Sequence, residues 1–524
     1  MEGTYEEEKE RYLQYYNKTQ ATSGTQEELR TTPLFTLAVQ RTTQKDLSSK
    51  LTALALDGDG DISPSSDESS DESETTSSSA CCDMSGCSGC PDFNDPCTTT
   101  SNIPPALTQY GLLGFDISNH ALTSTPEPIM LNVNAPNSAF ICGSQGSGKS
   151  YTLACMLENC LLKGTDTSNI FNPVGGVCFH YDIDSSNSIA ETARLCSRGI
   201  RTRVLVSRGN KRELTEAYMA LEGAQKYLTI EDLLLQPRHL SVERMLKLMS
   251  VNEGDHVPLY MVSLQRILRQ MAIDGRGRPF DYTFFKEELE RATFTDKQTG
   301  PLDLRIALLE SFMDLGGATK SNTQKARDIF RCEPGTLTIF DISDPFVDAN
   351  TACLLFDICL SLVKQNRPDA GLAIVLDEAH KYMTDSPAAN LFTDRLLTSI
   401  REQRHNATRV IIATQEPTIS GKLMELSSVT IVHRFTSPTW FAAIKNHLGG
   451  ASTLLRKEEE MMEMFERIVG LGVGESLVFS PASFLLLDDQ GRVGKLESGV
   501  VKMKTRVRLG VDGGMSVLAG GRKG

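Results

Sequence analysis

Features that mark membrane or secreted proteins are missing from this sequence of 524 residues. No apolar run approaches the roughly 20 residues that a membrane-spanning helix requires. The N-terminal residues fit neither a secretory signal peptide nor an arginine-rich transit peptide, because they are acidic and polar. We therefore expect a soluble intracellular protein with no membrane partner, and the sequence leaves the cytoplasm and the nucleus both open.

The chain also lacks a second C-x-x-C pair, although it has 13 cysteines. Without a secretion signal, these cysteines indicate free thiols in a reducing compartment. Cys87 and Cys90 form one C-x-x-C pair that could begin a zinc knuckle. No second such pair completes a ligand set, so zinc is not part of our prediction.

The acidic charge of the chain is concentrated in its first fifth. Residues 1–105 hold 19 acidic and 7 basic residues, a balance of −12 within the chain's net −14. Residues 65–79 consist almost entirely of Ser, Asp, Glu and Thr, too polar to bury a core. We predict an acidic, Ser/Cys-rich disordered tail over residues 1–105 and a nearly neutral folded part after it.

A glycine-rich loop follows the apolar run Phe140-Ile141-Cys142. Residues 143–150 match the phosphate-binding pattern G-x-x-x-x-G-K-[ST], with a strand expected before it and an amphipathic helix after it. Its glycines let backbone N–H groups converge on an anion, and the start of the helix adds its positive dipole end. Lys149 is placed to reach the β- and γ-phosphates of a nucleotide, and Ser150 to hold Mg²⁺. The predicted nucleotide-binding residues are Gly143, Ser144, Gln145, Gly146, Ser147, Gly148, Lys149, Ser150 and Tyr151.

Short apolar runs alternate with amphipathic helices after residue 105, which predicts a doubly wound α/β core around a mostly parallel sheet. Residues 210–330 interrupt this rhythm with helical patterns and few strand signals. We predict a first part of the core over 106–209, a helical insertion over 210–330, a second part of the core over 331–490, and a C-terminal strand and tail over 491–524. The expected strands are 139–142, 176–181, 203–206, 337–340, 373–376, 409–413, 429–433 and 476–479.

A second motif lies downstream, where four apolar residues, 373–376, end in Asp377 and Glu378. Carboxylates at the carboxyl end of a strand face the ligand crevice of an open α/β sheet. Asp377 is the expected Mg²⁺ ligand together with Ser150, and Glu378 is the expected general base for an attacking water. His380 gives the tetrapeptide a helicase-like appearance, but the next strand ends in Thr414-Gln415 rather than in the Ser-Ala-Thr motif of that class.

Gln415 ends the apolar run 409–413 and precedes Glu416-Pro417. A polar amide at this position can contact the γ-phosphate or the attacking water, which makes Gln415 a candidate sensor. A plain turn before the proline is the alternative explanation.

Together these motifs resemble those of the HerA/FtsK group of P-loop ATPases over roughly residues 130–490. The resemblance rests on the phosphate loop (Walker A), the strand ending in Asp377-Glu378 (Walker B), the helix end Arg401-Glu402-Gln403-Arg404, and Thr414-Gln415-Glu416-Pro417. Residues 506–519 are also similar to the ends of uncharacterised fungal HerA-like P-loop proteins.

The resemblance implies a homo-oligomer, in that family a hexameric ring, that binds ATP and Mg²⁺, hydrolyses ATP between subunits and moves DNA. Arg404 is the best match to the arginine that completes a neighbour's site in this family. Arg401 and Arg434 are the next candidates. The folded part of the chain shows no equivalent of the small β-barrel that precedes the core in HerA.

DNA binding has one independent sequence feature. Lys502, Lys504, Arg506 and Arg508 alternate with other residues, so on a strand they share one face. Such a row could follow a phosphate backbone, or it could be the solvated side of an edge strand. Two alternative functions stay open: a nucleotide-gated scaffold that binds ATP with little turnover, and a small-molecule kinase.

Overall fold

The computed structural model describes residues 24–44, 107–118, 125–183, 188–249, 259–275, 280–292, 294, 296–314, 328–447, 458–488 and 490–512. The chain divides into two units, one made of Met1–Gln40 with Ala106–Gly524 and the other of Arg41–Pro105. The first unit contains the sheet and every residue discussed below. The C-x-x-C pair and the acidic serine-rich stretch lie outside the described residues.

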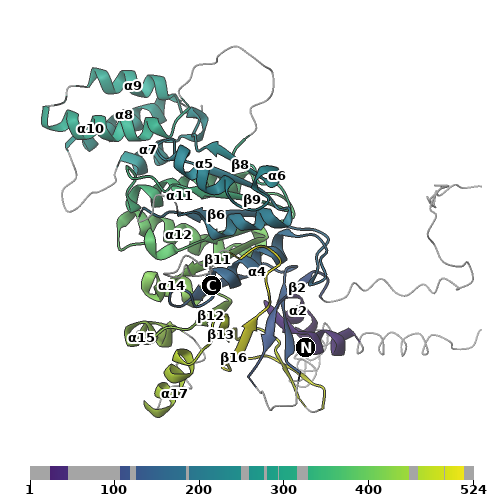
Figure 1. The fold of residues 1–524 in the computed structure, drawn as a ribbon. Coiled ribbons are helices and arrows are strands. Elements are labelled where there is room, and N and C mark those ends of the chain that lie inside the picture. The colour runs from purple at the N-terminus through teal and green to yellow at the C-terminus, as the bar shows by residue number, and fades with distance from the viewer. Residues whose placement is uncertain are drawn as a thin grey trace, which may run out of the picture. The chain divides into compact units, whose positions relative to one another are not determined.

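Eight parallel strands form one half of a 14-stranded sheet, in the order β12-β4-β11-β10-β6-β9-β7-β8. Most of their residues are buried, as expected for strands covered on both faces. The confirmed fold class is therefore an α/β core with a mostly parallel sheet (Figure 1). The strands are β4 (Ser138–Cys142), β6 (Gly175–His180), β7 (Arg201–Val206), β8 (Leu228–Asp232), β9 (Thr336–Asp341), β10 (Leu372–Leu376), β11 (Thr408–Thr414) and β12 (Val429–His433).

Alternate residues of each strand enter two separate hydrophobic cores, because successive side chains of a strand point to opposite faces. Phe140 and Cys142 of β4 belong to one core, whereas Ala139 and Ile141 belong to the other. Helices α11 (Ala349–Gln365) and α12 (Pro387–Arg401) contribute to the first core. Helices α4 (Lys149–Leu161) and α5 (Lys211–Met219) and the 3₁₀ helix η1 (Glu191–Arg198) contribute to the second.

The other half of the sheet is antiparallel and extends the parallel half beyond β12. Its order is β13-β16-β2-β3-β1, and β5 pairs with β2. The strands are β1 (Leu34–Thr36), β2 (Tyr110–Asp116), β3 (Glu127–Asn132), β5 (Ser168–Asn169), β13 (Glu475–Phe479) and β16 (Val501–Thr505). Strands β1 and β16, which are far apart in the sequence, thus belong to the same sheet.

One segment of the predicted N-terminal tail belongs to this sheet. Helix α2 (Gly24–Thr31) leads into β1, whose three residues are all buried. The sequence gives little sign of this because a three-residue strand is too short for a periodic pattern. Residues 24–36 are therefore part of the folded sheet unit.

The predicted helical insertion contains mostly helices and one strand of the core. Residues 228–232 form β8, which pairs with β7 at the edge of the sheet, so the insertion begins after that strand. The helices that follow are α7 (Val242–Met249), α8 (Leu259–Gly275), α9 (Tyr282–Arg291) and α10 (Asp296–Ser311). They lie together beyond the sheet edge (Figure 1). Within the described ranges, no helix has both the length and the apolar character needed to cross a bilayer.

Short helices that flank β11 in the sequence complete the described fold. They are α13 (Gln403–Asn406), α14 (Gly421–Leu426), α15 (Pro438–His447) and α17 (Glu458–Val469). Strands β14 (Leu486–Leu487) and β15 (Val493–Gly494) form a separate two-stranded sheet.

Candidate nucleotide site

The phosphate loop lies at the carboxyl end of β4 and leads directly into α4. Gly143, Gly146 and Gly148 have positive φ angles of 152°, 71° and 111°. A side chain at Gly143 would come within 2.7 Å of the Cβ of His433, so glycine is also required there for space. The loop therefore has the turn geometry that directs backbone N–H groups toward an anion at a helix N-terminus.

Lys149 is buried beside this loop, and its Nζ donates a hydrogen bond to the Ser144 carbonyl at 3.0 Å. Burial lowers the pKa of Lys149, and the charges of Glu378, Cys142 and Asp377 oppose that shift. Lys149 therefore lies close enough to Asp377 and Glu378 for their charges to act on it. Ser147 is also held inside the loop, because its hydroxyl donates to the Ser144 carbonyl at 2.7 Å.

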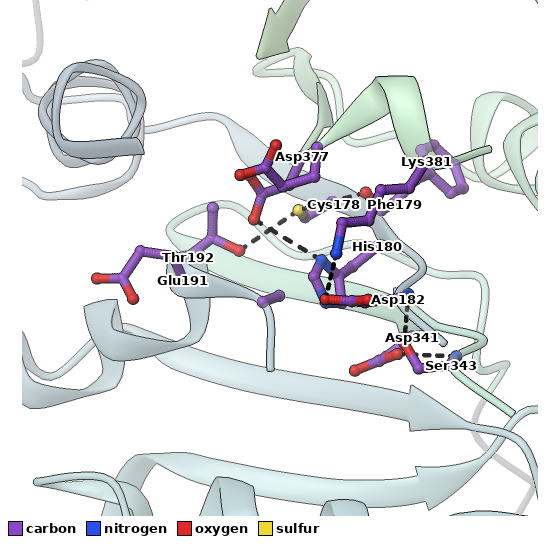
Figure 2. Close-up of polar contacts among 12 residues, drawn as sticks. Cys178, Phe179, His180, Asp182, Glu191, Thr192, Asp341, Ser343, Asp377 and Lys381 are labelled. Atoms are coloured by element: carbon purple, nitrogen blue, oxygen red, sulfur yellow. Dashed lines mark hydrogen bonds and ion pairs between the residues drawn. The ribbon is translucent and has the colours of Figure 1, made fainter. Parts of the chain in front are cut away.

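Asp377 and Glu378 follow β10, which is separated from β4 by β11 alone. Asp377 is buried, and burial raises its pKa to about 6, against the opposing effect of His180. Nδ1 of His180 lies 3.8 Å from the Asp377 carboxylate, as Figure 2 shows. Nearby, Lys381 and Asp182 form an ion pair at 2.5 Å, which ties the turn after Glu378 to the end of β6.

Glu378 has an unusual backbone conformation, with φ of 47° in the left-handed region. Non-glycine residues in this region carry strain and are enriched at functional sites. Its carboxylate accepts hydrogen bonds from Nε2 of Gln415 at 3.3 and 3.4 Å. Nδ1 of His380 lies 3.4 Å from the same carboxylate, and burial is the main cause of the lowered pKa of His380. Glu378 is therefore positioned by Gln415, which follows the last residue of β11.

One cavity of about 840 Å³ is lined by both the loop and Glu378, whereas Asp377 is buried and is not among its lining residues. The loop contributes Gln145, Gly146, Gly148, Lys149, Ser150 and Tyr151 to its wall. Glu378 and Glu191 line it as well, together with residues of the segment 473–512. The structure thus brings the predicted loop and the predicted general base into one crevice, although more than 200 residues separate them in the sequence.

Arg401 and Arg404 do not lie in this cavity. Arg401 ends α12 and Arg404 belongs to α13, and both are exposed. They precede the first residue of β11, whereas the phosphate loop follows the last residue of the parallel strand β4. The two arginines therefore lie at the opposite edge of the sheet from the loop of the same chain. Arg434, in contrast, is next to the loop, since its carbonyl accepts the N–H of Ser144 at 2.9 Å.

The row of four cations near the C-terminus does not form one solvated face. Arg506 and Arg508 are buried and pair with Glu158 and Glu191, at 2.8 and 2.9 Å. The strand that precedes them, β16, contains Lys502 and Lys504 and is an inner strand between β13 and β2, not an edge strand. The expectation of a continuous row of cations that follows a phosphate backbone is therefore wrong. Alternation on a strand places side chains on the same face, but it does not decide whether that face is exposed to solvent.

His433 packs against the phosphate loop and was not among the predicted residues. Its Nδ1–H donates to the Glu475 carbonyl at 3.0 Å, and its Nε2 lies 3.1 Å from the Thr152 hydroxyl. Since Nδ1 is the donor, a neutral ring accepts from Thr152 at Nε2, and burial lowers the His433 pKa to about 4. A single histidine at a strand end gives no sequence signal for this role.

Two residues offer the oxygen ligands that Mg²⁺ requires. Ser150 lines the cavity, and the buried Asp377, which is not among the lining residues, follows the last residue of β10. In the described part of the chain there is no cluster of three or more His, Cys, Asp or Glu side chains suited to a metal. Mg²⁺ is commonly held by one or two protein oxygens together with water and substrate phosphates, so Ser150 and Asp377 fit it without such a cluster.

No protein-family model matches the chain, and no curated protein sequence does. Similar solved structures exist at low identity. VirB4 of Thermoanaerobacter pseudethanolicus is 12% identical with a TM-score of 0.47, over 76% of this chain and 96% of that one. The plasmid coupling protein TrwB, in complex with a GTP analogue, is 11% identical with a TM-score of 0.38, over 71% and 86%.

The genome-packaging NTPase B204 of Sulfolobus turreted icosahedral virus 2, in complex with ATP-γS, is 9% identical with a TM-score of 0.25, over 69% and 96%. These similarities are too low for any residue role to be carried over to this chain. The similarity of residues 506–519 to fungal proteins stays a prediction.

Proposed function

We propose that this chain is a Mg²⁺-dependent ATPase of the HerA/FtsK type. One observation carries the proposal: the phosphate loop with Lys149 and the carboxylate of Glu378 line the same cavity. A loop alone would support nucleotide binding. A carboxylate held by Gln415 within the same cavity supports hydrolysis as well, because it can polarise a water against the terminal phosphate.

In the proposed reaction, the loop amides and Lys149 hold the β- and γ-phosphates. Ser150 and Asp377 would hold Mg²⁺, which when bound would neutralise charge on the phosphate oxygens. Glu378 accepts a proton as water attacks the γ-phosphorus, and the bond from that phosphorus to the β–γ bridging oxygen breaks. The Gln415 amide keeps the Glu378 carboxylate in position during this step.

The proposal also covers assembly and DNA translocation, which are more specific claims than ATP hydrolysis. Arg401 and Arg404 are exposed and remote from the cavity of their own chain, so any role in hydrolysis requires a second copy. We therefore extend the proposal to a homo-oligomer, a hexamer by family resemblance, in which these arginines approach the site of a neighbour. DNA remains the proposed cargo on the basis of the family resemblance alone, because the row of four cations does not form one exposed face that could bind it.

The proposal is tested by steady-state ATP hydrolysis with Mg²⁺, with and without single- and double-stranded DNA. Lys149→Ala should abolish ATP binding, because it removes the positioned charge on the phosphates, whereas the exposed Lys163→Ala should bind normally. Glu378→Gln should bind ATP but hydrolyse it at least about 100-fold more slowly.

Three outcomes separate the candidate functions. Turnover that DNA stimulates and Glu378→Gln removes supports a DNA motor. Turnover that Glu378→Gln removes but DNA does not change supports an ATPase acting on another substrate. Equal and negligible turnover in both proteins, with ATP still bound, would leave the nucleotide-gated scaffold as the function.

A further inference from the structure

His180 is a buried histidine whose ring the proposed reaction does not use. It is the last residue of β6 and is 3% exposed. Among the described residues, neither of its ring nitrogens has a hydrogen-bond partner. Most buried polar side chains have such a partner, because an unpaired one costs free energy. The neighbours of this ring therefore decide what it does in the fold.

The sheet places His180 beside Asp377. Strands β6 and β10 are parallel neighbours in which Cys178 is paired with Val375, so His180 and Asp377, each two residues further on, are level with each other. Cys178 and Val375 both belong to the hydrophobic core to which α4 contributes. Because alternate residues of a strand share a face, His180 and Asp377 lie on the α4 side of the sheet, the side of the helix that follows the phosphate loop.

The side chains of His180 and Asp377 are in contact. Nδ1 of His180 lies 3.8 Å from the Asp377 carboxylate, a contact that Figure 2 marks. This distance is longer than a hydrogen bond. The backbone N–H of Asp377 donates to the Phe179 carbonyl at 3.1 Å, so the two backbones are fixed to each other. A small torsional change at either side chain is therefore enough to bring Nδ1–H and the carboxylate to hydrogen-bond length.

Asp341 is the other carboxylate level with His180, since it is paired with His180 on the second neighbour of β6, strand β9. Its two oxygens already have donors. Oδ2 accepts from the Tyr218 hydroxyl at 2.5 Å, and Oδ1 accepts from the backbone N–H of Ser343 at 3.0 Å. In the part of the chain that the structure describes, Asp377 is the carboxylate that forms an ion-pair contact with the ring.

We propose that His180 is a positioning residue for Asp377, and that its Nδ1–H holds the carboxylate in the orientation that Mg²⁺ requires. This inference rests on the proposed function and assigns one more residue to the same site. His180 does not touch the nucleotide or the metal, and it acts through Asp377. Carboxylates that bind a metal are themselves held by hydrogen bonds, and loss of such an outer bond typically costs about 10- to 100-fold in metal affinity or activity.

The test measures metal binding to the full chain in the presence of ATP. Calorimetry gives the Kd for ATP with Mg²⁺ and in EDTA, and electron paramagnetic resonance with Mn²⁺ gives a metal affinity directly. His180→Asn keeps an amide N–H near the place of Nδ1 and should bind both metals nearly as the unchanged protein does.

Two other variants lack a donor at that place. His180→Gln has its amide near the place of Nε2, and His180→Leu has no donor. Both should lose about 10- to 100-fold in metal affinity, whereas their affinity for ATP in EDTA should stay unchanged, because the loop amides and Lys149 are intact. The exposed His405→Leu, on α13, is the matched control and should bind metal normally.

Two results would overturn the inference. One is a folded His180→Leu protein that binds Mg²⁺ and Mn²⁺ as tightly as the unchanged protein. The other is an equal loss of metal affinity in His180→Asn and His180→Gln, which would make the ring a packing residue, and this comparison stands even where the leucine variant does not fold. Failure of the proposed function has a different signature, because the unchanged protein would then bind ATP no more tightly with Mg²⁺ than in EDTA.

Discussion

The side-chain amide of Gln415 lies 3.3 Å from one carboxylate oxygen of Glu378 and 3.4 Å from the other. The two residues lie just beyond the carboxyl ends of the neighbouring parallel strands β11 and β10, so the pairing of these strands brings them close together. Glu378 also has a strained backbone conformation. A carboxylate in such a position relies on its hydrogen-bond partner for its orientation, which makes Gln415 a positioning residue for Glu378.

Replacement of Gln415 by alanine should therefore slow hydrolysis without preventing nucleotide binding. We expect kcat to fall roughly 10- to 100-fold, because a misplaced base costs about this much, with little change in the Kd for ATP. Steady-state kinetics combined with calorimetry measures both quantities. The exposed Gln490→Ala should behave as the unchanged protein. A Gln415→Ala protein with unchanged kcat would contradict the role.

The buried pair of Glu158 and Arg506 should be important for stability. Glu158→Gln leaves the Arg506 guanidinium buried without its counter-charge and weakens the acceptor for two backbone N–H groups. We expect the free energy of unfolding to fall by about 3–5 kcal/mol in denaturant titrations. Glu216→Gln removes an exposed partner of Arg212 and should cost less than about 1 kcal/mol. Equal effects of the two changes would argue against this role of the pair.

His433 predicts a pH dependence of stability below neutrality. Its pKa is about 4 in the folded protein, against 6.5 for the free side chain, because burial disfavours the charged ring. Between these values the unfolded chain binds more protons than the folded one, so the contribution to stability is present above pH 6.5 and is lost as the pH falls toward 4. The full loss is on the order of 3 kcal/mol.

His433→Gln is the variant that checks this dependence, since it has an amide in place of the titrating ring. We expect its Tm to fall less between pH 7 and pH 5 than that of the unchanged protein. His239 and His380, whose pKa values are also lowered, are present in both proteins, so the difference isolates His433. Identical pH profiles would contradict the prediction.

A mixing experiment tests whether the remote arginines act on a neighbouring copy. Arg404→Ala and Glu378→Gln proteins should each be nearly inactive if hydrolysis needs both groups. In a mixed oligomer, some sites would combine an intact Glu378 from one copy with an intact Arg404 from the next, so turnover should recover after mixing. No recovery, together with a monomer by light scattering in ATP and Mg²⁺, would contradict a role between subunits. Arg401→Ala can be examined in the same way.

Much of the parallel core could be predicted from sequence, for a physical reason. Strands buried on both faces must be apolar throughout, so β4, β10, β11 and β12 are visible as continuous runs. The loop pattern also fixes its own local structure, since few glycine arrangements turn from a strand into a helix. The expectation that the acid pair lies beside the loop followed from parallel strands having their carboxyl ends at one edge.

Other parts depended on contacts that no local pattern records. Strand β1 is three residues long and is stable only because β3 pairs with it. Strand β8 was hidden in a helical region because its alternating burial differs from that of the fully buried strands. The alternating cations were predicted to share one side, but Arg506 and Arg508 are buried partners of acids, because Glu158 of α4 and Glu191 of η1 pack against the segment that follows β16.

The sequence by itself determined the phosphate loop, the acid pair and the class of fold, because each depends on residue types at short, fixed spacing. The tertiary structure decided which distant residues surround the site, namely His433, which packs against the loop, and Arg508, which lies over Tyr151 and lines the cavity. Those contacts join residues about 280 and 357 positions apart, as the hydrogen bonds from Thr152 to His433 and from Arg508 to Tyr151 show. They come together because β12 and β16 both pair with β13 in one sheet, and strand pairing over such separations leaves no mark on the neighbouring residues.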